Sequence, residues 1–337
     1  MPQNINKQIS IIGAGGWGTA LAKLLIENGY DVLLWSFEPE VAQEINTNHS
    51  NSVYLRNISL PINLTATSSL DDVLINDLLI LAVPTQFIVD TLSKTDIDFS
   101  RKNIVNVAKG IEKNSLKRIS EILADNFNVQ LDSYAIITGP SHAEEVARKI
   151  PTTVVAASEN LLLAKEIQNI FSNNYFRVYS SDDVIGCELG GAVKNVIAIA
   201  AGIIDGLGLG DNTKAALITR GLAEMSRLGI ALGANAQTFS GLSGLGDLIV
   251  TCNSRFSRNR FVGEQIGKGK SYESIVSEMK MIAEGVFTTQ SAYDLGLKHG
   301  VELPIVEQVH RILFENVKPL DAINDLMTRK TKREWWW

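Results

Sequence analysis

Apolar residues follow two different periods along the chain, and the change falls near residue 180. Before that point, short β-branched runs alternate with stretches whose apolar positions recur at helical spacing. This alternation is typical of βα units that build a parallel sheet. The runs that predict strands are Gln8–Ile12, Asp31–Trp35, Asp77–Val83, Asn103–Val107, Ser133–Ile137, Thr152–Ala156 and Tyr175–Tyr179.

From Ser181 onward, alanine- and leucine-rich stretches recur at helical spacing, and no run predicts a strand. Ser181 and Asp182 suit the N-cap of a long helix. We therefore expect an α/β protein of two domains. Residues 1–180 form a Rossmann-type dinucleotide-binding domain with a mostly parallel sheet, and residues 181–337 form an all-helical substrate-binding and catalytic domain. A length of 337 residues agrees, because single cores rarely grow beyond about 250–300 residues.

Charge and composition narrow the class of protein. A net charge of −6 argues against nucleic-acid or anionic-membrane binding, because both need a net basic face. The apolar run from Leu189 to Ile204 is shorter than a membrane span and contains a lysine, so we expect a core helix rather than membrane association. Two cysteines, no signal-peptide pattern and scattered histidines predict a cytoplasmic protein without a metal site. The tryptophan tail, 335–337, receives no function.

Lys194 is the only charged residue between Glu188 and Asp205, within that apolar run. Burial of an unpaired ammonium is costly, so the side chain must meet water, an anion or a ligand. Lys194 is therefore a candidate proton donor, with space for a ligand left by Gly190 and Gly191. The alternative is a helix residue whose stem extends to solvent.

A glycine loop, Gly13-Ala-Gly-Gly-Trp-Gly18, joins the first expected strand to a helical stretch. Gly13 suits the tight turn, Gly15 the close approach of a pyrophosphate, and Gly18 the packing of helix on strand. In this context the motif predicts dinucleotide binding. Trp17 either packs on a ligand or braces the loop.

The residues after the second expected strand leave the choice between NAD and NADP open. Ser36 and Phe37 stand where a ribose-binding acid is usual, and no arginine is present to select NADP. Ser36 can donate to a 2′-phosphate, and Phe37 can cover adenine. Glu38 favours NAD if its side chain turns inward.

Two segments of the first half offer groups for anion binding at strand ends. Lys109 follows the strand expected at 103–107, at the edge where ligands bind in open α/β sheets. The loop Thr138–Ala143 offers backbone N–H groups and a hydroxyl. The alternatives are a solvated loop lysine and an ordinary Gly-Pro turn.

In the second half, Asp247 and Thr251 lie four residues apart on one helical face and together can bind a substrate hydroxyl. Asp247 can instead be a first-turn acid favoured by the helix dipole. The segment 254–260 then brings together Arg255, Arg258 and Arg260 near Ser257 and Asn259, which predicts a phosphate clamp. A solvated basic turn is the alternative.

Six motifs in this order resemble bacterial NAD(P)-dependent glycerol-3-phosphate dehydrogenases. They are the glycine loop, Ala108–Gly110, Gly139–Ser141, Gly191–Val196, Gly246–Ile249 and Ser257–Asn259. The resemblance implies reversible reduction of dihydroxyacetone phosphate to sn-glycerol 3-phosphate, the backbone of phospholipids, with NADH or NADPH. It also implies a homodimer as a possible state and a catalytic role for Lys194 at the substrate C2 oxygen.

The resemblance assigns further residues to two groups. The substrate contacts are Lys109, Gly139, Ser141, Lys194, Asp247, Ser257, Arg258 and Asn259, to which the helical spacing adds Thr251. To the loop residues Gly13, Gly15 and Gly18 it adds the cofactor contacts Gly16, Trp17, Ser36, Phe37, Tyr54, Lys109, Ala143, Arg258, Ile282 and Glu284. Phe37 departs from the basic or imidazole side chain usual in the family, and Gly16 departs from the commoner serine.

Two other functions are compatible with part of this pattern. A β-hydroxyacid or 6-phosphogluconate-type dehydrogenase also has a catalytic lysine in a helical domain, but its asparagine four residues later is Ala198 here. A non-catalytic NAD(H) sensor is expected to carry a DNA-binding segment, and no basic helix-turn-helix is evident. Both patterns fit less of the chain.

Overall fold

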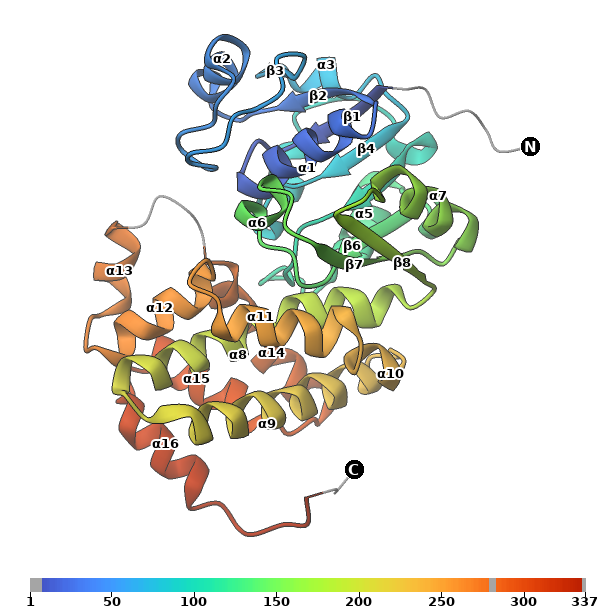
Figure 1. Cartoon of the computed structure of the whole chain (residues 1–337). Coiled ribbons are helices and arrows are strands. Elements are labelled where there is room, and N and C mark those ends of the chain that lie inside the picture. Colours follow the sequence, from blue (N-terminus) through green and yellow to red (C-terminus); the bar gives the residue numbers. More distant parts are fainter. Residues whose placement is uncertain (1–7, 279–282, 335–337) are drawn as a thin grey trace. The chain divides into compact units, whose positions relative to one another are not determined.

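The computed structural model describes residues 8–278 and 283–334, which form two compact units. The first unit comprises Met1–Lys109 and Ile119–Val184, and the second comprises Gly110–Arg118 and Ile185–Trp337. The chain therefore enters the second unit briefly after Lys109 before it completes the first (Figure 1).

The first unit contains an eight-stranded, mostly parallel sheet in the order β3-β2-β1-β4-β5-β6-β7-β8, as expected. Only the β6–β7 pair is antiparallel. The strands are β1 (Gln8–Ile12), β2 (Asp31–Trp35), β3 (Thr65–Thr67), β4 (Leu78–Leu81), β5 (Asn103–Asn106), β6 (Tyr134–Thr138), β7 (Thr152–Ala157) and β8 (Phe176–Ser181). The sequence pattern did not predict β3, a three-residue edge strand with only Ala66 buried between two threonines.

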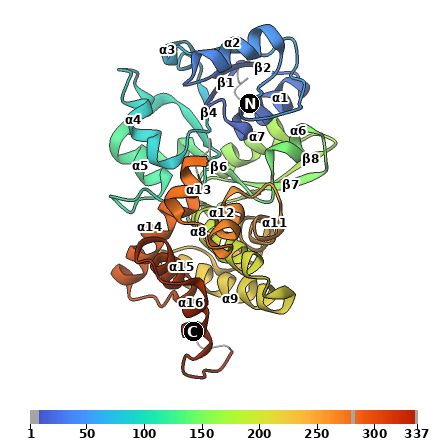
Figure 2. The same cartoon turned by 90° about the vertical axis from the view of Figure 1, so that its left-hand side faces the viewer.

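Helices cover both faces of this sheet. Figure 2 shows α4 and α5 on one side, and α1, α6 and α7 on the other. The helices of the unit are α1 (Gly16–Glu27), α2 (Pro39–Asn48), α3 (Leu70–Val73), α4 (Ile88–Leu92), α5 (Ile119–Phe127), α6 (Ala143–Ala147) and α7 (Leu161–Phe171). Ile9, Ile11, Leu34 and Val105 are fully buried in the core, so the central strands read as continuous apolar runs.

The second unit is helical in its described part, as the sequence predicted. Its elements are α8 (Val184–Leu207), α9 (Gly210–Ala231), α10 (Ala236–Phe239), a π-helical turn (Leu242–Gly246), α11 (Asp247–Asn253), α12 (Arg258–Gly267), α13 (Tyr272–Glu278), α14 (Glu284–His299), α15 (Pro304–Phe314) and α16 (Pro319–Met327). One expectation was wrong: Ser181 ends β8 instead of capping α8, which begins at Val184.

Helix α8 is the core helix of this unit. It is long and apolar enough to span a membrane, yet its apolar stretch is entirely buried within the protein. Ile111, from the short segment 110–118, joins the same core. Arg118 closes that segment with an ion pair to Glu188 of α8, at 2.7 Å. These contacts tie the segment that follows Lys109 to the helix that carries Lys194.

Glycines let α8 and α12 pack backbone to backbone. A Cβ atom on Gly202 would lie 1.9 Å from the carbonyl oxygen of Arg260, and one on Gly263 would lie 1.9 Å from that of Ile199. No real Cβ atom approaches an oxygen so closely. The seam therefore fixes the first turn of α12 relative to α8.

A buried carboxylate caps α15 from a neighbouring helix. Glu224 of α9 is only 3% exposed and accepts hydrogen bonds from the backbone N–H groups of Ile305 and Val306. Burial raises the pKa of Glu224 from 4.5 to about 7, although the two N–H donors oppose that shift. Between pH 4.5 and about 7, Glu224 is therefore protonated in the folded protein but ionised in the unfolded chain.

We expect Glu224 to make the protein less stable as the pH rises. Its contribution to the free energy of unfolding is fully present below pH 4.5. Up to about 3 kcal/mol of that free energy is lost as the pH rises through about 7. Urea unfolding at both ends of this window checks the expectation. Glu224→Gln should gain stability relative to the wild type as the pH rises. The exposed Glu307→Gln of α15 is the control, and equal pH dependence of all three proteins would refute it.

Candidate active site

The candidate proton donor of the second unit is buried and paired. Lys194 is 6% exposed, and its Nζ lies 2.8 Å from Asp247 Oδ1 and 2.7 Å from Thr251 Oγ1. The Thr251 hydroxyl donates to the backbone carbonyl of Asp247 at 2.6 Å, so its oxygen accepts from the lysine. Asp247 and Thr251 do share one helical face, and that face meets the Lys194 ammonium.

Local structure explains how α11 reaches α8. The π-helical turn 242–246 runs directly into α11, and Asp247 is the first residue of that helix. A Cβ atom on Gly190 would lie 2.7 Å from the carbonyl oxygen of Ser243, so this glycine admits the π-helical turn. The expectation that Gly190 leaves space for a ligand was therefore wrong. The close approach brings Asp247 beside Lys194 instead.

The neighbouring thiol does not compete for this proton chemistry. Cys252 is fully buried beside Thr251, and burial raises its pKa to about 12. The nearby Lys194 ammonium lowers that pKa but does not cancel the effect of burial. At neutral pH the thiol therefore stays protonated.

The start of α12 connects this cluster to α14. Ser257 caps α12 by accepting a hydrogen bond from the N–H of Arg260. Asn259 is buried, and its side-chain oxygen accepts from the backbone N–H of Gly285 at 3.0 Å. A Cβ atom on Gly285 would also lie 2.8 Å from the carbonyl oxygen of Asn195, the residue after Lys194. The ends of α12 and α14 thus meet α8 beside Lys194.

The three arginines of the predicted clamp have different surroundings. Arg260 is held by Asp205, with Nη1 2.5 Å from Oδ2, and also pairs with Glu264. The Arg255 guanidinium lies 5.0 Å from the ring centroid of Phe256. Arg258, the first residue of α12, is exposed and is the arginine that adjoins Ser257 and Asn259. Sequence spacing alone could not distinguish these three side chains.

The first unit has a glycine cradle at the end of β1. A Cβ atom on Gly18 would lie 2.0 Å from the carbonyl oxygen of Gly13, which itself has a φ of +119°. By contrast, nothing lies within 4 Å of a Cβ position on Gly15, so backbone N–H groups can approach a ligand there. This geometry fits the pyrophosphate of a dinucleotide. Trp17 packs partly against the core of its own unit.

A buried asparagine that the sequence pattern did not single out braces this loop. The Asn51 side chain donates to the carbonyl oxygen of Ala14 and to Thr19 Oγ1, both at 2.9 Å. Its oxygen accepts from the backbone N–H of Tyr54. The Tyr54 carbonyl oxygen in turn lies 2.7 Å from a Cβ position on Gly16. The structure therefore places Tyr54 against the glycine loop, where the resemblance expected a cofactor contact.

Beyond β2, Glu38 turns toward the neighbouring polar side chains. Its carboxylate accepts from the Tyr54 hydroxyl at 2.6 Å, and Ser36 Oγ lies 3.5 Å away. Burial and the hydrogen bond to Glu38 raise the pKa of Tyr54 to about 12, so the phenol remains a donor at neutral pH. Phe37 is 66% exposed, with the Lys94 ammonium 5.0 Å from its ring centroid.

The strand-end residues of the other half of the sheet also meet. Lys109 Nζ and Ser141 Oγ each donate to the carbonyl oxygen of Gly139, at 3.0 Å. Asn106 braces the backbone before Lys109 through two hydrogen bonds with Ala108. Two further expected cofactor contacts, Ala143 and Glu284, are the first residues of α6 and α14. Ile282 lies outside the described residues.

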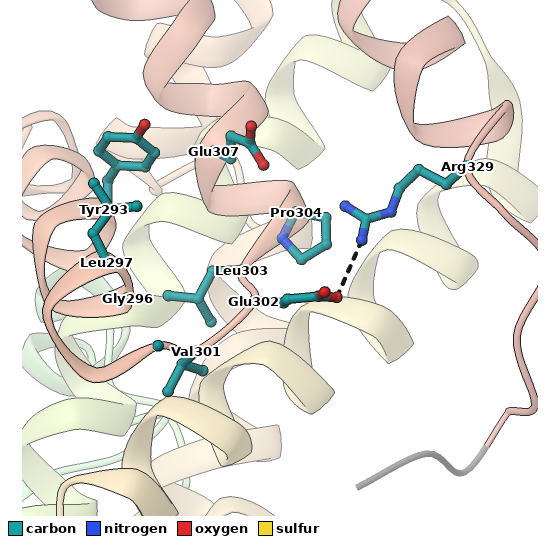
Figure 3. Close-up of a pocket in the computed structure, with 10 residues that line it drawn as sticks. Tyr293, Gly296, Leu297, Val301, Glu302, Leu303, Pro304, Glu307 and Arg329 are labelled. Carbon is teal, nitrogen blue, oxygen red and sulfur yellow. Dashed lines mark hydrogen bonds and ion pairs between the residues drawn. The ribbon is translucent and has the colours of Figure 1, made fainter.

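A separate cavity of about 340 Å³ lies in the second unit and includes none of these residues. It is lined by the α14–α15 connection and by Arg329, which pairs with Glu302 at 3.3 Å (Figure 3). No group of three or more metal-ligating side chains occurs within residues 8–278 and 283–334.

A glycine cradle on a mostly parallel sheet, together with a buried lysine in a helical unit, defines the class of a two-domain dinucleotide-dependent dehydrogenase. Models of the N-terminus and the C-terminus of NAD-dependent glycerol-3-phosphate dehydrogenase match residues 8–164 and 183–324. The chain belongs to the family of NAD(P)-dependent glycerol-3-phosphate dehydrogenases, as its motifs predicted. The family match therefore favours glycerol-3-phosphate dehydrogenase over both alternatives, the 6-phosphogluconate-type enzyme and the NAD(H) sensor.

Individual relatives agree over nearly the whole chain. The glycerol-3-phosphate dehydrogenase [NAD(P)+] of Lysinibacillus sphaericus is 49% identical over 97% of this chain and 98% of the relative. That of Chlorobium phaeobacteroides is 51% identical over 97% and 99%. The crystal structure of the Coxiella burnetii enzyme covers 96% of this chain and 99% of its own, with 39% identity and a TM-score of 0.90. The expected oxidoreductase activity, with NAD(P) and the dihydroxyacetone phosphate and glycerol 3-phosphate pair, is confirmed.

Proposed function

We propose that Lys194 is the proton donor in the reduction of dihydroxyacetone phosphate to sn-glycerol 3-phosphate. The observation that carries the proposal is its burial with Asp247 and Thr251, which hold Nζ by two hydrogen bonds. A lysine fixed in this way presents its N–H bonds in one geometry, which favours proton transfer to a positioned oxygen. When bound, NAD(P)H supplies the hydride for C2.

The residues around Lys194 have distinct roles in this proposal. Asp247 balances the ammonium charge, and Thr251 orients it. Asn259 and Ser257 position the first turn of α12, and Arg258 binds the substrate phosphate through charge-assisted hydrogen bonds. The remote phosphate contact orients the ketone relative to Lys194, so binding energy contributes to the chemical step.

The same proposal assigns the first unit to the cofactor. The glycine loop, with Trp17 at its mouth, binds the pyrophosphate, and Ser36, Phe37 and Tyr54 lie beside the adenosine half. Lys109, Gly139 and Ser141 contact the substrate, Lys109 also contacts the cofactor, and Ala143, Ile282 and Glu284 complete the cofactor contacts. We place the domain boundary near residue 180, and we infer a cytoplasmic homodimer that supplies glycerol 3-phosphate for phospholipid synthesis. Sedimentation equilibrium tests the dimer.

The role of the phosphate can be tested with two substrates. Dihydroxyacetone phosphate should be reduced with NADH or NADPH, whereas unphosphorylated dihydroxyacetone should show poor turnover even at saturating concentration. Comparable kcat values for the two substrates would contradict phosphate-assisted orientation. The dissociation constant of NADH, measured in parallel, distinguishes weaker cofactor binding from a slower chemical step.

Arg258→Gln should lower kcat/KM for dihydroxyacetone phosphate by about tenfold to a hundredfold. A loss of this size is expected when one hydrogen bond to a charged group is removed. The loss should be much smaller for unphosphorylated dihydroxyacetone. Arg255→Gln is the matched control, because Arg255 lies three residues away and its guanidinium contacts Phe256. Equal losses in both variants, or for both substrates, would remove Arg258 from the phosphate site.

A further inference from the structure

The end of β2 carries an acid in a position that the motifs do not assign. Glu38 lies about 20 residues after the last glycine of the loop, the usual distance of a ribose-binding acid in dinucleotide-binding domains. It follows β2 by three residues instead of standing directly at the strand end. Its side chain nevertheless turns back to contact Ser36, which does follow the strand.

A chain of contacts fixes this carboxylate relative to the glycine loop. The Tyr54 hydroxyl donates to Glu38 at 2.6 Å, and the Tyr54 backbone lies against Gly16, the first residue of α1. The Asn51 side chain accepts a hydrogen bond from the Tyr54 N–H and donates one to the carbonyl oxygen of Ala14 in the loop. Glu38 is therefore anchored through Tyr54 to the element that binds the pyrophosphate.

Gly16 is required for this anchoring. A Cβ atom at that position would meet the Tyr54 carbonyl oxygen at 2.7 Å, and backbone cannot move aside as a flexible side chain can. The usual serine would therefore displace the Tyr54 turn.

The local charge favours an unphosphorylated ribose. A carboxylate accepts hydrogen bonds from ribose hydroxyls but repels a 2′-phosphate. The Lys94 ammonium is exposed and lies over the exposed ring of Phe37, where water and salt screen its charge. Glu38 is half-buried and held by a short hydrogen bond, so its charge acts from a fixed place.

We propose that Glu38, held by Tyr54, is a specificity-determining residue that selects NAD(H) over NADP(H). The proposal rests on the assignment of the first unit as the cofactor-binding unit. Glu38 acts by accepting a hydrogen bond from the adenosine ribose and by repelling the phosphate that NADP(H) carries there. Tyr54 positions the carboxylate and remains protonated at neutral pH.

The test measures the dissociation constants of NADH and NADPH by calorimetry, in the absence of substrate. Wild-type protein should bind NADH at least about tenfold more tightly than NADPH. Glu38→Gln keeps the shape but removes the charge, and should reduce this ratio by about tenfold. Tyr54→Phe should reduce it in the same direction. Glu40→Gln is the matched control, because Glu40 is an exposed acid two residues further along α2.

Three outcomes would overturn the proposal. They are equal affinity of the wild type for both cofactors, an unchanged ratio in Glu38→Gln, and an equal change in Glu40→Gln. Loss of NADPH binding in Lys94→Ala with no effect of Glu38→Gln would assign selection to Lys94. If neither cofactor binds, the assigned cofactor unit fails and this inference with it. If NADH and NADPH bind with the same affinity while dihydroxyacetone phosphate is reduced, only the specificity proposal fails.

Discussion

Lys194→Ala lowers kcat for the reduction of dihydroxyacetone phosphate by about a hundredfold or more. In the proposed mechanism this variant lacks the group that protonates the substrate oxygen, and a loss of this size is typical of general acid–base residues. Steady-state oxidation of NADH with saturating substrate measures the effect. The dissociation constant of NADH should change little, because the glycine cradle belongs to the other unit.

Two controls separate this catalytic loss from a structural one. Lys214→Ala removes another lysine of the same unit, which pairs with Asp205 at 2.9 Å, and should retain most of kcat. Lys194→Ala also leaves the Asp247 carboxylate buried without its ammonium, which is destabilising. The double variant Lys194→Ala, Asp247→Asn removes that charge and should regain stability without activity. A folded Lys194→Ala protein with near-normal kcat would refute the assignment.

Gly263→Val is expected to destabilise the protein by about 4 kcal/mol or more, or to prevent folding. Its Cβ would begin 1.9 Å from the carbonyl oxygen of Ile199, and the two added methyl groups have no space in the seam between α8 and α12. Overpacking in a well-packed interior typically costs about 1–3 kcal/mol, and a backbone-to-backbone contact cannot relax as a side chain does.

Guanidinium unfolding measures this loss, with Lys268→Ala as the control at the exposed C-cap of α12. The control should differ from the wild type by about 0.5 kcal/mol or less. Gly263→Ala should give an intermediate loss, which provides a measurable value if the valine variant does not fold. A stability of Gly263→Ala equal to that of the control would show that α8 and α12 can separate without cost.

The fold was predictable because its signals are local. Continuous apolar runs marked the buried strands, and helical spacing marked the second half. Strand β3 lacked such a signal, because a short Thr-Ala-Thr edge strand buries one small side chain. The start of α8 was missed because Ser181 still pairs with Ala157 in the sheet. Both differences arise where tertiary pairing outweighs local preference.

The sequence singled out separate residues of the candidate site but did not show how they pair. An isolated lysine in an apolar run identified Lys194, and helical spacing placed Asp247 and Thr251 on one face. Nothing in the sequence showed that this face meets Lys194. Arg258 and Arg260 look alike in the sequence, which does not show that Arg260 pairs with the distant Asp205. The direction of Glu38 likewise depends on Tyr54, a contact between separate turns of the chain.

The most direct test of the role of Lys194 is a single-turnover measurement. Protein saturated with NADH is mixed with dihydroxyacetone phosphate, and cofactor oxidation is followed for the wild type and for Lys194→Ala, each with its NADH affinity measured. The account predicts equal cofactor binding and an oxidation rate at least about a hundredfold slower in the variant. Equal rates in the two proteins would contradict it.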